Sequence, residues 1–493
     1  MATTLKGIIG GGTTFSASPA IESVNLDYYA KNNISGYKTI ESIPTDNLNY
    51  LNSVHPSSMI KSFEGCNKLK SIDLSKLDTS NVTSMKKLFL NCFCLTSIDL
   101  SNFNTSKVTD MSNMFAGING TDDENMEEPD DSLIVTIKGL DKFDTSKVTT
   151  MKGMFDSYYL PDDNDEDYPP AADIYINNLD VSSFDTSNVT DMSDMFNGVY
   201  NVNGSIDNVS SIDVSNFDTR KVTDMSFMFN ESSNPILSDK FDTSNCESIA
   251  YAFSQISLNK NSYSIIKKLN LSKCKDIISC LLNSEIPDDN LDLSNWDLRS
   301  LKRFGGFFNY YTLNGNRVNL TEDKLILPDN FYTKIYSQIE YLTRPFPRCE
   351  TNDELKTYMK KMNTKSVKSL SNLYTIYAFY KTNVDTIDMD LLDLSSLTNT
   401  SQMFEYSEFV TINMTNMVMS KVDYMYDMFA SCNKLVTING IIDLSGLASI
   451  NHASDMFKGC KNLKNVKVRL ANYSPSEFET ATGISRNQYT IVS

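Results

Sequence analysis

Histidine and tryptophan are scarce in this 493-residue sequence, which contains only His55, His452 and a single tryptophan. Imidazole is the commonest catalytic base and a frequent zinc ligand, so most histidine-based catalysis and metal binding are disfavoured. The sequence also contains no nucleophile elbow, Walker loop, zinc-protease helix motif or dinucleotide fingerprint. We therefore expect a protein that is not an enzyme, has no catalytic or metal-ligating residues and needs no cofactor.

Positively charged residues are fewer than negatively charged ones. The sequence contains 44 Lys and Arg and 62 Asp and Glu, which gives a formal net charge of −18. This charge repels phosphate backbones and anionic lipid, so we expect neither nucleic acid nor a membrane surface as a partner. No apolar run reaches the roughly 18 residues of a membrane-spanning helix. A hydrophobic fraction of 40% is ample for a folded core.

Export signals are also missing from the amino-terminal sequence. The apolar stretch at residues 7–9 is interrupted at once by Gly10, Gly11 and Gly12, so no secretory signal is predicted. No cysteine precedes Cys66, which excludes a lipid-modified cysteine near the start. We expect residues 1–50 to form an attachment or capping segment.

Nine cysteines are present, but no C-x-x-C pair occurs. Four of them follow a phenylalanine by three residues, at positions Cys66, Cys92, Cys432 and Cys460. A cysteine that recurs at a fixed position relative to phenylalanine is typical of a small apolar core residue. We favour buried thiols over disulfides or a metal site.

An internal repeat dominates the sequence. The clearest copies occupy residues 71–89, 97–115, 139–155, 180–196 and 211–229, and degenerate copies occupy 291–296, 391–404, 421–429 and 441–457. A period of about 26 residues, with some longer steps, indicates one structural coil that sometimes carries an inserted loop.

Each copy predicts a small structural unit. Ile98 and Leu100 alternate with polar residues, which indicates a short strand with these two side chains inward. Residues 104–106 are short polar residues that favour a turn. Thr109 is placed to cap a helical segment over 110–115. A strand, a turn and a short helix cannot bury their apolar side alone, so we expect the copies to stack as a solenoid.

The combination Phe-Asp-Thr-Ser-Asn-Val-Thr-Asp-Met-Ser-x-Met-Phe, followed by Cys-x-x-Leu-x-x-Ile-Asp-Leu-Ser, resembles the BspA-like leucine-rich-repeat surface proteins. The resemblance is strong over 59–253, partial over 385–470 and weak between them. It implies an α/β solenoid, a right-handed leucine-rich-repeat-like array, and a role in adhesion or recognition. Bacterial members usually carry an export signal or lipid anchor, whereas similar repeats in phage virion proteins and protozoan parasites often do not.

The domain organisation follows from the repeat. We expect an attachment or cap segment at 1–50, a solenoid with acidic loop insertions at 51–302, an irregular aromatic-rich insertion at 303–384, resumed repeats at 385–470 and a carboxy-terminal cap at 471–493. The acidic insertions include 121–131 and 161–170. Neither matches a twelve-residue calcium loop, so solvated acidic loops are favoured over calcium sites.

Two sets of residues are candidate contact sites. Aromatic residues with arginine are typical interface anchors, and the insertion offers such a set: Phe304, Phe307, Phe308, Tyr310, Tyr311, Arg344, Phe346 and Arg348. The alternative is that these rings form the core of a small subdomain. Carboxylates at one repeat position predict a polar strand face, formed by Asp73, Asp99, Asp180, Asp213 and Asp292. The favoured alternative there is that each Asp bonds a neighbouring Ser and stays solvated.

The sequence thus favours a non-catalytic recognition or adhesion protein that uses an extended repeat surface to bind a protein or glycan on a host or cell surface. We expect a virion component, such as a phage fibre or appendage, that attaches to its particle through residues 1–50. A cell-surface adhesin with an unrecognised export route and a structural scaffold without an external ligand are the alternatives. A homo-oligomer is left open.

Overall fold

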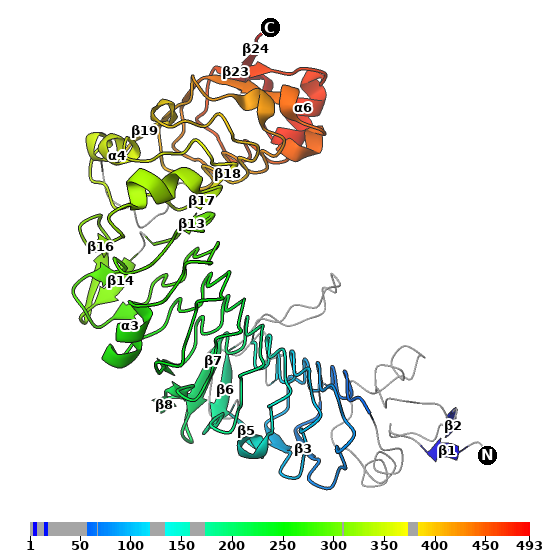
Figure 1. The fold of residues 1–493 in the computed structure, drawn as a ribbon. Coiled ribbons are helices and arrows are strands. Elements are labelled where there is room, and N and C mark those ends of the chain that lie inside the picture. Colours follow the sequence, from blue (N-terminus) through cyan, green and yellow to red (C-terminus); the bar gives the residue numbers. More distant parts are fainter. Residues whose placement is uncertain are drawn as a thin grey trace. The chain divides into compact units, whose positions relative to one another are not determined.

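The computed structural model describes residues 3–6, 14–17, 57–66, 68–118, 134–157, 173–307, 310–372 and 383–493. The two acidic insertions and most of the expected attachment segment lie outside these ranges. The chain divides into two compact units, Met1–Asn270 and Leu271–Ser493. In each unit, successive coils of the chain lie side by side (Figure 1).

Short parallel strands build the first unit. The main sheet has six strands in the order β3-β4-β5-β6-β7-β8, and all neighbours except β7 and β8 are parallel. Its strands are β3 (Ser71–Asp73), β4 (Ser97–Asp99), β5 (Ile134–Lys138), β6 (Ile174–Asn177), β7 (Val199–Val202) and β8 (Val209–Ser210). The smaller pairs are β1 (Thr3–Lys6) with β2 (Thr14–Ala17), and β9 (Ile212–Asp213) with β10 (Pro235–Ile236).

The second unit repeats this arrangement in several smaller sheets. The parallel sheets are β13 (Arg303–Gly305), β17 (Tyr341–Thr343) and β18 (Ser369–Ser371); β19 (Thr386–Asp388), β20 (Thr411–Asn413) and β21 (Thr437–Asn439); and β22 (Ile441–Asp443), β23 (Val466–Arg469) and β24 (Tyr489–Ile491). The remaining strands are β11 (Glu285–Ile286), β14 (Tyr310–Leu313) and β15 (Asn316–Asn319), and β12 (Leu291–Asp292) with β16 (Leu325–Ile326).

Few helices accompany the strands in the described ranges. The α-helices found there are α3 (Lys260–Ile266), α4 (Asn352–Met359) and α6 (Pro475–Thr482), and a π-helical turn, η4, spans Phe331–Ile335. None of the helices in the described ranges has the length and apolar character needed to cross a bilayer. The protein is therefore a solenoid of short parallel strands with a few short helices, as the repeat predicts.

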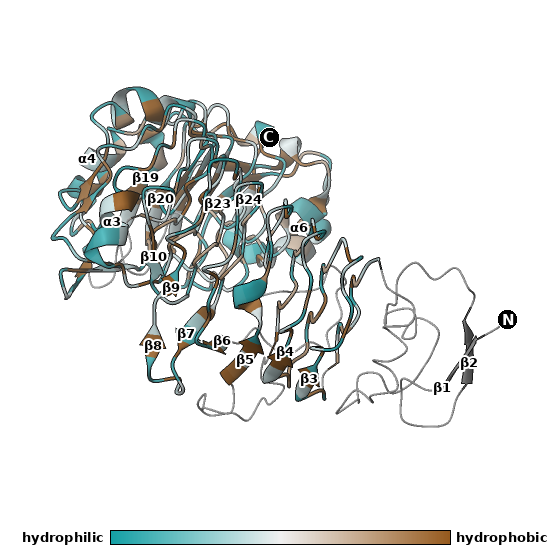
Figure 2. Ribbon diagram, turned by 60° about the horizontal axis from the view of Figure 1, so that its bottom comes forward, coloured by the Kyte–Doolittle hydropathy of each residue, from teal (hydrophilic) through white to brown (hydrophobic). Residues whose placement is uncertain are grey.

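The core runs along the repeat as columns of identical side chains. Phe89 stacks on Phe115 at 5.7 Å between ring centroids, and Phe115 stacks on Phe155 at 5.3 Å. The column continues through further coils at Phe63, Phe196, Phe229 and Phe253. Hydrophobic and hydrophilic residues are interspersed along the coils (Figure 2). Stacking identical coils therefore buries the side chains that one coil cannot bury.

The repeat cysteines belong to this core. Cys92 and Cys460 are buried, and each thiol donates a hydrogen bond to a phenylalanine carbonyl of the preceding coil, Phe63 and Phe429, at 2.9 Å. Burial raises the pKa of the Cys92 thiol, chiefly by desolvation of the thiolate. All nine cysteines are free thiols, and only Cys94 is partly exposed. The interpretation of the repeat cysteines as buried thiols agrees with these positions.

One local prediction was wrong: residues 110–115 do not form a helix. Their alternate amides instead bond to the next coil, from Met111 to the Thr150 carbonyl at 3.2 Å and from Phe115 to the Met154 carbonyl at 2.8 Å. Thr109 does not cap a helix, because its hydroxyl donates to the Thr83 carbonyl of the preceding coil. Hydrogen bonds between coils replace helical ones. They satisfy the backbone amides and carbonyls, and at the same time they bury the apolar side chains of this segment.

Left-handed residues make these segments turn. Asn113 has φ of +54°, and Gly117, four residues later, has φ of +61°. A Cβ atom on Gly117 would lie 2.5 Å from Oδ1 of Asn91. The position of Asn113 carries bulky residues in other coils, such as Phe227 and Tyr251, both at φ of +57°. The stacking of coils therefore holds these residues in a left-handed backbone conformation that residues with side chains rarely adopt.

Buried threonines join consecutive turns. The Thr186 hydroxyl donates to the Asp218 carbonyl at 3.0 Å and accepts the Asp218 amide at 2.8 Å. Thr105 and Thr219 make the same pair of bonds to the next coil. Each of these threonines is 2% exposed or less. One hydroxyl thus satisfies two backbone groups of the neighbouring coil.

The segment 303–384, expected to be an irregular insertion, contains three short strands that continue the parallel ladder between coils. β13, β17 and β18 pair in parallel, with Arg303 opposite Tyr341 and Tyr341 opposite Ser369. Further bridges continue this ladder from Asp276 to Arg303 and from Ser369 to Asn399. The ladder consists of backbone groups, so it persists where the sequence motif has faded.

Thr186→Val tests the threonine bridge, because valine has nearly the same shape but no hydroxyl. It leaves the Asp218 amide and carbonyl without their partner, and unpaired buried groups cost about 1–3 kcal/mol. We expect the free energy of unfolding to fall by about 2 kcal/mol in urea denaturation. Thr190→Val is the matched control, since Thr190 is exposed and its amide already bonds to the Thr149 carbonyl at 2.9 Å. Equal losses in the two variants would contradict the bridge.

Candidate recognition surfaces

The carboxylates expected on the polar strand face occupy the surface, and each is held by its own turn. Asp73 accepts the Ser75 amide at 2.9 Å, and Asp99 accepts both the amide and the hydroxyl of Ser101. Asp180, Asp213 and Asp292 bond to the amide two residues on in the same way. The Ser75 and Ser182 bonds lower the pKa of Asp73 and Asp180, respectively.

These carboxylates do not form one continuous row. Asp73 lies opposite Asp99, but the next residue in register after Asp99 is Lys138. Asp213 lies opposite Ile236, and Asp292 lies opposite Ile326. The strand face is therefore a set of separate Asp–Ser turns with different neighbours. This geometry agrees with the alternative in which each Asp bonds a neighbouring Ser.

The aromatic residues proposed as partner contacts are mostly inside the second unit. Phe304 and Phe307 stack at 5.4 Å, and both are fully buried. Tyr311 is also fully buried, and Phe346 is 1% exposed and packs against Tyr358. Phe308 and the side chain of Tyr310 lie outside the described part of the chain. The buried rings form a local core, as the alternative interpretation states.

The two arginines of that set are partly exposed. Arg348 pairs with Glu350 at 2.6 Å and lines a cavity of about 370 Å³ beside α4, together with Glu322 and Tyr358. Arg344 lies at a left-handed position with φ of +42°. Their contact with a partner stays a prediction.

A different surface of this unit combines basic and aromatic side chains in register. The Arg303 guanidinium lies 4.7 Å from the Tyr341 ring centroid and pairs with Asp276 at 2.6 Å. Beside it, Glu340 bridges Lys302 at 2.9 Å and Lys368 at 2.6 Å. These two ammonium groups lower the pKa of Glu340, with Lys368 contributing most. Tyr341 is 39% exposed, so this surface has the composition of an interface.

The most regular surface lies in the first unit and comes from the Asp-Thr-Ser turn of each coil. The third turn residue is serine in most coils and Arg220 in one. The residue after it is exposed in five coils and half-buried at Asn245, the following valine or cysteine is buried, and the next residue faces solvent. We define the turn face as Asn81, Lys107, Lys147, Asn188, Lys221 and Asn245, with the exposed threonines Thr83, Thr109, Thr149, Thr190 and Thr223.

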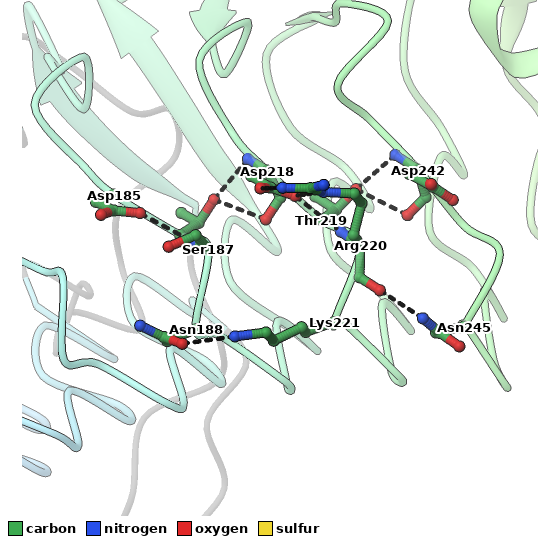
Figure 3. A network of polar contacts seen from close by, with 10 residues as sticks. Asp185, Ser187, Asn188, Asp218, Thr219, Arg220, Lys221, Asp242 and Asn245 are labelled. Atoms are coloured by element: carbon green, nitrogen blue, oxygen red, sulfur yellow. Dashed lines mark hydrogen bonds and ion pairs between the residues drawn. The ribbon is translucent and has the colours of Figure 1, made fainter.

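Hydrogen bonds between coils hold the turn face. Lys221 donates to the Asn188 side chain at 2.6 Å (Figure 3). Asn188 donates in turn to the Ser146 carbonyl at 2.8 Å. Lys107 bonds to the Asn81 side chain at 3.0 Å, and Asn245 donates to the Arg220 carbonyl at 2.6 Å. These contacts fix polar side chains at a regular spacing of about one strand separation, 4.8 Å.

An acidic patch lies where the methionine-containing segments stack. Asp191 and Asp224 bridge in adjacent coils, and Asp194 lies near both, with Lys152 at 3.9 Å from its carboxylate. Burial is the main cause that raises the pKa of Asp194 to about 6, and the charges of Asp224 and Asp191 add to it. Within the described ranges, no group of His, Cys, Asp and Glu is arranged to hold a metal ion.

The turn face was missed by sequence reasoning, although a signal was present. The residue that follows the three turn residues is Lys or Asn in all six coils, while the residue two positions on is nearly always threonine. Within any one copy the turn has only the features of a local motif. The pairing of Lys with Asn across coils becomes visible only when the copies are placed in register.

Asp194→Asn tests the acidic patch through pH. The pKa of Asp194 is about 6 in the fold and near 3.8 in the unfolded chain, so ionisation weakens the fold as pH rises from about 4 through 6. We expect the variant to melt at a higher temperature than wild type at pH 7.5, with the difference vanishing near pH 4. Asp180→Asn should show the opposite sign, because hydrogen bonds from Ser182 lower the Asp180 pKa. No pH dependence in the Asp194 difference would contradict the assignment.

Comparison with known proteins assigns a family. The model of the family described as "Mycoplasma protein of unknown function, DUF285" matches repeatedly, at residues 37–127, 57–208, 165–284, 207–319 and 341–472. The chain belongs to this family. A leucine-rich repeat protein from Bacteroides ovatus, known from its crystal structure, is 14% identical and aligns over 89% of this chain and 88% of its own, with a TM-score of 0.19. No protein of curated function shows significant sequence similarity to the chain.

Proposed function

We propose that this DUF285 family member is a non-catalytic recognition protein whose turn face binds an extended polymer on a cell surface. One observation carries the proposal: consecutive coils present the same polar turn, and hydrogen bonds such as Lys221–Asn188 and Lys107–Asn81 fix these side chains in register. A preorganised polar surface loses little side-chain entropy on binding. Repeated weak contacts to one polymer then add up as multivalent binding.

Polysaccharide is the ligand class that suits this surface best. Ammonium groups, amides and threonine hydroxyls are the groups that hydrogen-bond to sugar hydroxyls. Their spacing of about 4.8 Å from coil to coil is regular, as the repeating units of a polysaccharide are. A surface protein is the alternative partner, and the exposed Arg303 and Tyr341 in the second unit favour it there, because Arg and Tyr are enriched in interface hot spots.

We propose an extracellular location, either on a virion or on a microbial cell. The virion version rests on residues 1–50 as an attachment segment. The cell-surface version is supported by the family description, which refers to a cellular organism. Immunogold labelling of native particles and cells separates the two: gold on particles supports the virion version, and gold on cells alone supports the adhesin.

A charge-reversal variant tests the turn face. Combining Lys107→Glu, Lys147→Glu and Lys221→Glu removes its exposed ammonium groups without altering the core. We expect retention on a glycan array and on intact host cells to fall at least about tenfold, because several contacts are lost together. Flow cytometry with the labelled protein measures the binding to cells.

The matched control carries Lys68→Glu, Lys70→Glu and Lys260→Glu, which make the same charge change at exposed positions of the first unit outside the turn face. Unfolding curves should be similar for both triple variants and wild type. Equal binding by the two variants would contradict the turn face as the binding surface. Absence of wild-type binding to any glycan or cell would favour the scaffold alternative.

A further inference from the structure

A groove in the second unit lies where the strand ladder shifts between coils. Asn413 and Asn439 are the last paired residues of β20 and β21. After Gly440 the chain starts β22, which pairs with β23. A Cβ atom on Gly440 would lie 2.7 Å from the Met414 carbonyl oxygen, so the two coils approach closely at that point. A groove of about 420 Å³ lies beside this point.

Three successive coils line the groove. One contributes Thr415 and residues 417–420, the next contributes Gly440, Ile441 and Asp443, and the third contributes Lys467 and Arg469. Val418 is 39% exposed and Ile441 is 36% exposed, although both are aliphatic. The groove therefore combines a small open apolar surface with two cationic side chains.

The two cationic groups differ in their surroundings. Arg469 donates to the Asp443 carboxylate at 2.6 Å and to the Ser493 carbonyl at 2.9 Å, which fixes its guanidinium. Lys467 lies opposite Ile441 in the sheet and is exposed. Within the described residues, no carboxylate forms an ion pair with Lys467. Its ammonium group is thus available to an external anion.

This arrangement stands out against the charge of the whole protein. The chain carries a net charge of −18, yet this groove presents Lys467 and Arg469 over aliphatic side chains. A carboxylate next to an aliphatic group complements both features. The exposed aliphatic surface consists mainly of Val418 and Ile441, which suits a branched side chain better than a long acyl chain.

We propose that this groove binds an acidic peptide segment in which an Asp or Glu carboxylate pairs with Lys467 while a neighbouring aliphatic side chain packs on Val418 and Ile441. Arg469, held by Asp443, adds positive potential and directs the carboxylate. The proposal goes beyond polymer binding by the turn face, because it concerns other residues, in the other unit, and a different ligand class.

Fluorescence anisotropy of the full-length protein tests the site with a short labelled peptide that alternates Glu with Leu. We expect a dissociation constant of about 10–100 µM, as suits a small site with one main ion pair. Replacing each Glu by Gln in the peptide should weaken binding by about tenfold. Raising the salt concentration should also weaken it, because the lysine is exposed.

Lys467→Glu should weaken binding of the acidic peptide by at least about tenfold. Lys461→Glu is the matched control: it makes the same charge change at an exposed position of the same coil, outside the groove, and should change affinity less than about twofold. Ile441→Ser tests the apolar half and should weaken binding of the Leu-containing peptide but not of a Glu–Gly analogue. Unfolding curves for all three variants should resemble wild type.

Several results would overturn the site. These are no peptide binding at about 1 mM, equal binding of the Glu and Gln peptides, and equal affinity in Lys467→Glu and wild type. Binding of decanoate but not of the peptide, lost in Lys467→Glu, would replace the peptide by a fatty acid and contradict the proposal. None of these outcomes bears on the turn face, which the triple variants test separately.

Discussion

Hydrogen bonding in register between consecutive coils is the constraint on which the structure depends. Alternate amides in the methionine-containing segments bond to the next coil, and buried threonine hydroxyls such as Thr186 satisfy both an amide and a carbonyl of the next turn. These bonds fix the spacing at which the phenylalanines stack. They also fix the spacing of every outward side chain, so the core and the recognition surfaces share one cause.

The same constraint explains the unusual backbone. Phe227 and Tyr251 adopt left-handed conformations that cost about 1–2 kcal/mol each, and their rings stack at 4.6 Å between centroids. This cost is offset because the turn at these positions keeps the following amides aligned with the carbonyls of the next coil. At Gly440 the ladder changes from β20 and β21 to β22 and β23, and a groove lies beside this point. Regular stacking therefore produces periodic surfaces, and its interruption produces an individual site.

Much of the fold could be predicted from residues such as Ile98 and Leu100, whose alternation indicates an inward-facing strand side, and from the recurrence of phenylalanine and cysteine. The segment 110–115 could not, because its three- to four-residue apolar spacing also fits a helix, and only bonding to the next coil decides against one. The regular backbone at Arg303, Tyr341 and Ser369 was hidden because backbone pairing leaves no sequence motif.

The candidate sites were harder to predict than the fold. Composition alone cannot distinguish a buried ring such as Phe304 from an exposed one such as Tyr341, since that depends on the position of each in its coil. The turn face and the Lys467 groove both involve residues about one repeat or more apart, so they depend on the register between coils. Register depends on residues far apart in the sequence, so the recognition surfaces cannot be predicted from any single copy of the repeat.

Hydrogen exchange of the backbone amides tests the stacking most directly. The amides of Thr109, Thr149, Thr190 and Thr223 each bond to the preceding coil at 2.8–2.9 Å, although their side chains face solvent. Stacking in register predicts strong and similar protection at all four, because neighbouring coils open together. Exchange at the rate of an unstructured peptide at these positions would contradict the account.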